Sequence, residues 1–223
     1  MLTPGATGYP GWFFPHPAAA GGWRAPSTAL RSILVPIVPV IPGKPTKIWI
    51  TGSSGAGKST LAARLARALG LRHLELDGLY HQANWTPVDR DVMVRQVNHE
   101  LAQDGWIIDG NYHSVLGTSV GEHCELRIAL DLGTWRVLLR LTRRTFVRMA
   151  SGRELWNGNT EQWRNLLSLD PQENILLWAW TNRGKYHAAA REAEAASGVA
   201  GPRCVRLTSA AQVERFVRYL RQA

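Results

Sequence analysis

Cysteine is scarce in this chain: its 223 residues include only Cys124 and Cys204. The two are far apart in the sequence, which argues against a disulfide framework and against a cysteine-based zinc site. The seven histidines show no H-x-x-x-H or comparable ligand spacing, so a structural zinc site is not expected. Such cysteine usage is typical of a reducing compartment, and we expect a cytoplasmic protein.

Long apolar runs are missing as well. No stretch of about 18 uninterrupted apolar residues occurs, and the nearest candidate, residues 33–41, contains Pro36 and Pro39. That run follows about thirty residues rich in proline, glycine and aromatic side chains, whereas a signal peptide has a short basic start. We therefore expect neither a membrane span nor secretion.

Acidic residues are outnumbered, since 17 Asp and Glu against 26 Lys and Arg give a formal net charge of +9. A basic chain favours anionic partners: phosphates, nucleotides, nucleic acids or acidic surfaces. Residues 1–45 contain no acidic residue and nine of the 12 prolines. This composition predicts a disordered or loosely packed Pro/Gly-rich extension over 1–45 and one catalytic domain over 46–223. The alternative is a docking segment formed by the aromatic residues Trp12, Phe13, Phe14 and Trp23.

Within the predicted domain, strand-like and helix-like segments alternate, which is typical of an α/β fold with a parallel sheet covered by helices. The predicted strands span residues 47–51, 72–76, 106–109, 125–132 and 204–207. The predicted helices run from about residue 58 to Gly70, from an Asp89 cap to Gly105, and over 135–149, 172–196 and 209–220.

The strongest motif lies between the first predicted strand and helix. Its eight residues match G-x-x-x-x-G-K-[ST], the phosphate-binding P-loop, and are Gly52, Ser53, Ser54, Gly55, Ala56, Gly57, Lys58 and Ser59. Glycines let successive backbone N–H groups face phosphate oxygens, and the helix N-terminus adds its positive dipole. Lys58 is expected to reach the β and γ phosphates of ATP, and the Ser59 hydroxyl to bind Mg²⁺.

A P-loop usually needs a second, acidic group at the end of a nearby apolar strand, where it holds the water shell of the metal. Asp109 follows Trp106-Ile107-Ile108 and supplies it, the alternative being that Asp109 only starts a turn. Gly110 comes next, so the Glu that polarises water in many motor-type ATPases is missing. No Asn-Lys-x-Asp run occurs either, which disfavours a guanine-specific GTPase.

Four segments together resemble a known family. They read Ile-Thr-Gly-Ser-Ser-Gly-Ala-Gly-Lys-Ser-Thr, ending at Thr60, then Leu-Glu-Leu-Asp-Gly-Leu-Tyr (74–80), Gly-Trp-Ile-Ile-Asp-Gly-Asn-Tyr (105–112) and Ile-Ala-Leu-Asp-Leu (128–132). This pattern is similar to the bacterial topology modulation proteins, an adenylate-kinase-like P-loop group that also resembles shikimate and nucleoside kinases. The resemblance spans roughly residues 47–220.

The resemblance implies a P-loop fold of the nucleoside-monophosphate-kinase type. It implies a five-stranded parallel sheet in the order 2-3-1-4-5, helices on both faces, a lid over about 148–182, and use of ATP with Mg²⁺. It leaves the phosphoryl acceptor open, because the Asp-Gly-Phe-Pro-Arg segment typical of adenylate kinases is replaced here by Asp-Gly-Asn-Tyr.

Asp77 is expected at the carboxyl end of the second strand, where small-molecule kinases of this group resemble one another in carrying a carboxylate. A carboxylate that orients the acceptor hydroxyl and finally takes its proton suits the loose transition state of phosphoryl transfer. The alternative is a helix-cap or turn residue. Tyr80, His81 and Trp85 follow it in a loop expected over the same mouth.

The helix predicted from Trp135 is amphipathic. Its expected apolar side consists of Leu138, Leu139, Thr142, Phe146 and Met149, and its basic side of Arg136, Arg140, Arg143, Arg144 and Arg148. Arginines entering a lid can neutralise charge on the transferred phosphoryl group, and we select Arg140 and Arg144, with Arg183 as a third. Solvent-facing arginines are the alternative.

Ten tryptophans in a basic chain also suit nucleic-acid binding by stacking. That function is disfavoured because Trp49, Trp106 and Trp135 are expected on core-facing elements. We therefore predict an ATP-dependent kinase that acts on a small-molecule acceptor, a nucleoside, nucleotide or hydroxyl metabolite. The alternative is a regulatory nucleotide-binding protein that acts on DNA, RNA or a protein partner, with slow ATP hydrolysis.

Overall fold

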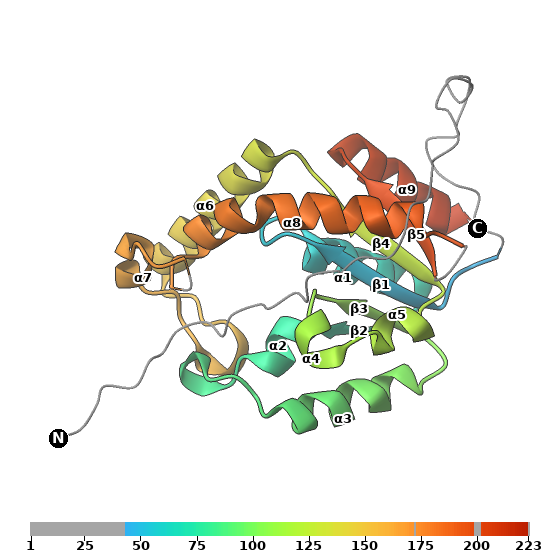
Figure 1. The fold of residues 1–223 in the computed structure, drawn as a ribbon, viewed down its shortest axis with the longest axis horizontal. Helices are drawn as coiled ribbons and strands as arrows, with labels where there is room; N and C mark the ends of the chain where they lie inside the picture. The colour runs from blue at the N-terminus through green and yellow to red at the C-terminus, as the bar shows by residue number, and fades with distance from the viewer. Residues whose placement is uncertain (1–42, 172, 199–201, 223) are drawn as a thin grey trace, which may run out of the picture.

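The computed structural model describes residues 43–171, 173–198 and 202–222. The extension predicted for 1–45 lies almost wholly outside these residues. The described chain forms a three-layer α/β domain (Figure 1). Its strands are β1 (Lys47–Gly52), β2 (Arg72–Glu75), β3 (Trp106–Asp109), β4 (Leu126–Leu130) and β5 (Arg203–Leu207). Its longer helices are α1 (Lys58–Leu69), α3 (Arg90–Leu101), α6 (Thr134–Ser151), α8 (Ile175–Ala195) and α9 (Ala210–Gln222).

The five strands form one sheet in the order β2-β3-β1-β4-β5, and every neighbouring pair is parallel. This confirms the predicted fold class and strand order. All carboxyl ends of the strands therefore meet at one edge of the sheet, which is where ligands bind in open α/β folds. The P-loop follows β1, the central strand, at that edge.

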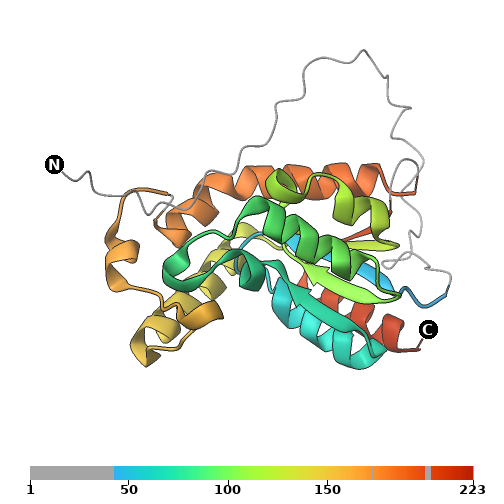
Figure 2. The ribbon, with the colours of Figure 1, turned by 90° about the horizontal axis from the view of Figure 1, so that it is seen from below.

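Helices cover both faces of the sheet because strand residues alternate between them. Ile48 and Ile50 face a core shared with α1 and α9, whereas Trp49 faces a separate core shared with α3. The short helices α4 (His113–Leu116) and α5 (Ser119–His123) pack on the α3 side. Figure 2 shows α1 and α9 together on one side of the sheet and α8 on the other.

Three local expectations are corrected. The second strand ends at Glu75, one residue earlier than predicted, and Asp77 follows it in the short helix α2 (Leu76–Tyr80). On α6 the buried stripe is Val137, Leu141, Thr145 and Met149. The predicted apolar side is thus wrong for Leu139 and Phe146, which are exposed, and Trp135 is 75% exposed and does not face the core.

Between α6 and α8 the chain forms two short helices, η2 (Trp156–Gly158) and α7 (Trp163–Leu167). This segment, residues 152–174, is called the lid below; residue 172 lies outside the described residues. Figure 1 shows the lid projecting beyond the sheet and reaching α2 and the 3-10 turn η1 (Ala83–Trp85). The lid therefore contacts the β2 side of the molecule, although it is far from β2 in the sequence.

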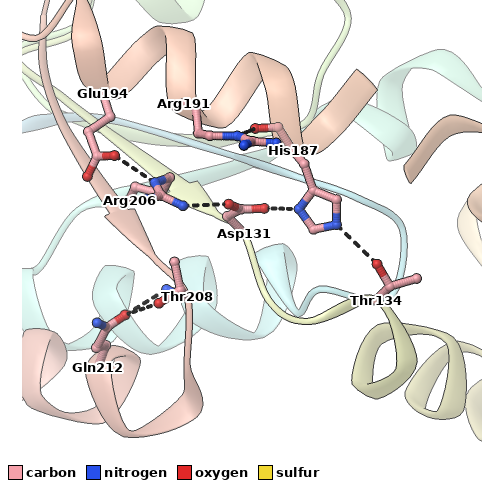
Figure 3. A network of polar contacts seen from close by, with 8 residues as sticks. All are labelled: Asp131, Thr134, His187, Arg191, Glu194, Arg206, Thr208 and Gln212. Atoms are coloured by element: carbon pink, nitrogen blue, oxygen red, sulfur yellow. Dashed lines mark hydrogen bonds and ion pairs between the residues drawn. The ribbon is translucent and has the colours of Figure 1, made fainter. Parts of the chain in front are cut away.

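A chain of polar contacts fixes α8 to the sheet (Figure 3). Asp131, just after β4, contacts His187 Nδ1 on α8 and accepts a 2.8 Å bond from Arg206 of β5. His187 Nε2 lies 3.1 Å from Thr134 Oγ1 at the start of α6. The two helices that flank the lid are thus joined at their sheet-side ends. No helix among the described residues is long and apolar enough to cross a membrane.

Candidate active site

The P-loop turns between β1 and α1 through glycines that no other residue could replace without strain. Gly52 has φ of 149°, and a Cβ there would lie 2.7 Å from the backbone oxygen of Leu130. Gly57 has φ of 97° and precedes α1 without a side-chain cap. The first N–H groups of α1 are consequently left for a ligand, and a helix N-terminus of this kind attracts anions.

The loop residues divide between a cavity and the core. Ser54, Gly55, Gly57, Lys58, Ser59 and Thr60 line a cavity of about 260 Å³. Ala56 is buried in the core, and Gly52 exchanges two hydrogen bonds with the Asn111 side chain. Lys58 Nζ donates to Ser53 O at 3.3 Å, so its ammonium lies folded over the loop, where a phosphate would be held.

Three side chains whose oxygen atoms could bind a metal ion lie together beside the P-loop. The Ser59 hydroxyl lies 2.6 Å from Glu75 Oε1 and 3.2 Å from Asp109 Oδ1, and it donates its one proton to either. Asp109 is 1% exposed, because β3 is an interior strand that lies between β2 and β1. Oxygen donors are the ligands that Mg²⁺ prefers. The predicted pair of Ser59 and Asp109 is therefore brought together, and Glu75 joins it.

The Asp109 and Glu75 carboxylates each have a further partner at their second oxygen atom. His73 Nε2 on β2 lies 2.6 Å from Asp109 Oδ2, and with Asp109 ionised the imidazole N–H donates. Trp156 Nε1 of the lid donates to Glu75 Oε2 at 2.8 Å. The oxygens that face Ser59 are consequently oriented by partners on β2 and on the lid.

Asp77 lies at the same cavity with one oxygen occupied. The Tyr112 hydroxyl donates to Asp77 Oδ1 at 2.7 Å, and burial together with the Asp77 charge strongly raises the pKa of Tyr112. Tyr112 therefore stays a neutral donor at all ordinary pH values. The Asp77 side chain itself lines the cavity.

The arginines of α6 take different positions. Arg144 lines the cavity, and its Nε is buried without a hydrogen-bond partner among the described residues. Burial, reinforced by the neighbouring Arg148 charge, lowers the pKa of Arg144 from its ordinary value. Arg140 is exposed, and its guanidinium lies against Gly57 of the P-loop. Arg183 stacks on Trp180 at 3.8 Å and lines a separate, smaller hollow.

The lid closes the cavity through asparagine contacts with the loop after α2. Asn159 Oδ1 accepts from Trp85 N at 2.8 Å, and its Nδ2 donates to Gln82 O at 2.8 Å. Asn157 Nδ2 donates to His81 O at 2.6 Å. These three bonds, called the lid clasp below, join η1 to η2 and roof the cavity on the β2 side.

Sequence reasoning missed several of these residues, chiefly Glu75, Tyr112, His73 and the lid asparagines. One signal was present: Glu75 and Asp77 alternate in Leu-Glu-Leu-Asp, so Asp77 follows Glu75, the last residue of β2, by only two positions. The asparagines gave no such signal, because their partners lie about 75 residues away in the sequence.

Comparisons with known proteins find relatives for part of this chain. The family described as adenylylsulphate kinase matches residues 44–107. Cytidylate kinase of Natronomonas pharaonis is 30% identical over 100 residues, covering 38% of this chain and 50% of that protein. Bifunctional pantoate ligase/cytidylate kinase of Acaryochloris marina is 42% identical over 45 residues, covering 20% of this chain and 9% of that protein.

Among solved structures, the shikimate kinase of Acinetobacter baumannii in complex with shikimate covers 79% of this chain and 92% of its own, with 17% identity and a TM-score of 0.45. The chain spans half or less of the curated relatives named above. The stretch that the adenylylsulphate kinase family matches, residues 44–107, includes β1, the P-loop, β2 and the first half of β3.

Proposed function

We propose that this protein is a kinase that transfers the γ-phosphoryl group of ATP to a small-molecule acceptor, with Mg²⁺ as its metal. The observation that carries the proposal is one cavity of about 260 Å³ lined by Lys58, Ser59, Asp77 and Arg144. Phosphoryl transfer requires little covalent chemistry from a protein beyond positioning and charge stabilisation. A phosphate site, an acceptor carboxylate and a buried arginine in one space supply both.

In the proposed reaction, the P-loop N–H groups and Lys58 bind the β and γ phosphates. Arg144, whose side chain lines the cavity, neutralises charge that spreads over the phosphoryl group during transfer. Arg140, at the rim beside Gly57, contributes to nucleotide binding from outside the cavity. Asp77 accepts a hydrogen bond from the acceptor hydroxyl, orients it toward the γ phosphate, and takes its proton as the new P–O bond forms.

The residues near Ser59 fit Mg²⁺. Ser59, Asp109 and Glu75 offer hard oxygen atoms, and the Ser59 hydroxyl lies within hydrogen-bond distance of both carboxylates. Among the described residues, no group of three or more His, Cys, Asp or Glu side chains is arranged to hold a metal by itself. Phosphate oxygens and water would therefore complete the coordination, as is usual for Mg²⁺. Bound Mg²⁺ would supply positive charge beside the β and γ phosphates.

The finer assignment, to the topology modulation proteins and to the cytoplasm, remains part of this proposal and rests on the quoted motifs and on the cysteine usage. The regulatory alternative is not favoured, because the carboxylate Asp77 faces the same cavity as the P-loop. A nucleotide-dependent timer has no use for an acceptor carboxylate there.

Replacement of Lys58 tests the proposal. In Lys58→Ala, acceptor-dependent ADP release should fall by at least about a hundredfold, the scale of losing one preorganised charge at the transferred group. Its melting temperature should stay near that of the wild type, because Lys58 lies at the cavity and not in the core. Lys185→Ala, at an exposed position of α8, is the matched control. Wild-type turnover in Lys58→Ala would exclude the P-loop as the ATP site.

A further inference from the structure

The part of the cavity away from the P-loop limits which acceptors the proposed reaction can use. This inference rests on the proposed function. That part, called the acceptor end below, is lined by α2, the loop after it, Tyr112 and the lid. Its chemistry differs from that of the P-loop end. The difference lies in the balance of charges and in the number of aromatic rings.

Carboxylates outnumber cations in the cavity. The cationic side chains that line it are Lys58, Arg144 and Arg148, and the carboxylates are Glu75, Asp77, Glu161 and Glu173. In the proposed reaction, Lys58 binds the phosphates of ATP and Arg144 neutralises the transferred phosphoryl group, so neither is left to bind the acceptor. A phosphate or carboxylate on the acceptor would therefore need Arg148 as its partner.

Arg148 already has a partner. Its guanidinium lies 3.1 Å from Glu161 Oε1, and the two side chains are 20% and 15% exposed. Separating such a pair to bind an anion would leave the Glu161 charge buried and uncompensated, which is costly. His81 offers no charge either, because burial lowers the pKa of its imidazole below the ordinary value, and the ring is neutral at pH 7. Among the residues that the structure describes, the acceptor end thus offers an anionic ligand no cation other than the paired Arg148.

Hydrogen-bond donors on a ligand, by contrast, would find acceptors at the acceptor end. Glu161 Oε2 is buried and has no hydrogen-bond partner among the described residues, and a buried carboxylate oxygen of this kind is stabilised by an N–H or O–H group. The side-chain amides of Gln162 and Asn165 line the same cavity. These groups suit a ligand with amino, amide or hydroxyl groups and no negative charge.

Aromatic rings form much of the remaining wall. Tyr80 and Tyr112 lie with ring centroids 4.8 Å apart, and His81 contacts Trp85 edge-on at 5.2 Å. Trp156 packs parallel to His81 on the lid side, and Trp178 lines the cavity from α8. Several rings around one space are suited to a planar ligand, because aromatic faces stack on heterocyclic bases.

We infer that the acceptor is an uncharged nucleoside, a planar base on a hydroxyl-bearing sugar, and not a nucleoside monophosphate or an anionic metabolite. Asp77 then orients the sugar hydroxyl, and the rings and amides of the acceptor end hold the base. In the transfer, the hydroxyl oxygen bonds to the γ phosphorus, the bond from that phosphorus to the β–γ bridging oxygen breaks, and the proton goes to Asp77. The products are a nucleoside monophosphate and ADP.

The test is ADP release by the full chain with ATP and Mg²⁺. Adenosine, cytidine, guanosine and uridine and their deoxy forms are compared with the corresponding monophosphates, with shikimate and gluconate as anionic hydroxyl compounds. We expect kcat/KM for the best nucleoside to exceed that for its monophosphate at least tenfold. A preference for monophosphates or for the anionic metabolites would overturn the inference and leave the kinase function intact. No stimulation by any compound would overturn both.

A charge variant tests the stated cause. Glu161→Gln keeps the size of the side chain but releases Arg148 from its ion pair, so kcat/KM for the monophosphate should rise about tenfold relative to the nucleoside. Glu154→Gln, at an exposed lid position that does not line the cavity, is the matched control and should leave the ratio unchanged. An unchanged ratio in Glu161→Gln would show that the Arg148–Glu161 pair does not exclude anions.

Discussion

At the scale of single residues, the site depends on how one carboxylate is oriented. Asp77 receives the Tyr112 hydroxyl on Oδ1, which fixes the rotation of the carboxylate. The position of the other oxygen, Oδ2, follows from that rotation. Tyr112 comes from the loop after β3, so the orientation of Asp77 depends on a residue that the sequence places 35 positions away.

Replacing Asp77 by asparagine should separate catalysis from nucleotide binding. Asp77→Asn keeps the size of the side chain but removes the proton acceptor, so single-turnover transfer should fall by roughly 10² to 10⁴. ATP affinity, measured by titration, should persist because the P-loop is untouched. Tyr112→Phe is the matched comparison and should cost about tenfold, since it removes the hydrogen bond to the charged Asp77 but keeps the carboxylate. Unchanged transfer in Asp77→Asn would exclude the residue from the reaction, and lost ATP affinity would reassign it to the nucleotide site.

At the scale of elements, α6 shows why a helical pattern can predict a helix and still miss its buried face. The predicted span 135–149 agrees with the observed Thr134–Ser151. The face was wrong because α6 leaves the sheet to support the lid, so packing selects Leu141 and Thr145 while Leu139 and Phe146 stay exposed. Burial on a helix of this kind depends on which neighbours meet it, and a single sequence does not list those neighbours.

The lid clasp gives a second prediction at this scale. Asn159 is 4% exposed and bonds both η1 and η2. Asn159→Ala removes the hydrogen bonds to the part-buried Trp85 N–H and Gln82 carbonyl, at a cost of about 0.5–1.5 kcal/mol for each bond. Amide hydrogen exchange should therefore speed up in residues 82–86 and 156–160, and KM for the acceptor should rise. The control is Asn98→Ala, at an exposed position of α3. Unchanged exchange in Asn159→Ala would mean that the clasp does not hold the lid.

At the scale of the whole molecule, the fold shields both cysteines, and this can be measured. Cys124 and Cys204 are free and buried. Burial raises the pKa of the Cys124 thiol to about 12 and that of Cys204 to about 11. At pH 8 the reactive thiolate is therefore a minute fraction of either group.

The native protein should accordingly react with a thiol reagent at pH 8 at least a hundredfold more slowly than a free thiol, whose pKa is about 8.5. Unfolding in guanidinium chloride should expose both groups at once and restore ordinary reactivity. The reaction is followed by absorbance, with glutathione as the free-thiol control. Rapid labelling of the folded chain would contradict the burial of these two residues.

The sequence by itself determined the kind of fold and the phosphate end of the site. Alternating strand and helix patterns, a glycine-rich loop between the first two elements, and Asp109 after an apolar strand are local signals with local physical causes. The strand order agreed with the resemblance to adenylate-kinase-like proteins. Ser59 and Asp109 could be paired in advance because parallel strands end at the same edge of a sheet.

Only the tertiary structure decided how the acceptor end is built. Glu75, Tyr112, Asn159 and Trp156 matter through partners that are distant in the sequence, and no spacing rule connects them. The Arg148–Glu161 pair exists because the chain turns back after α6, and that pair sets the charge which an acceptor meets. Local patterns report hydrogen-bond and burial preferences over a few residues, whereas the contacts that select a substrate form when the lid and the β2 side come together.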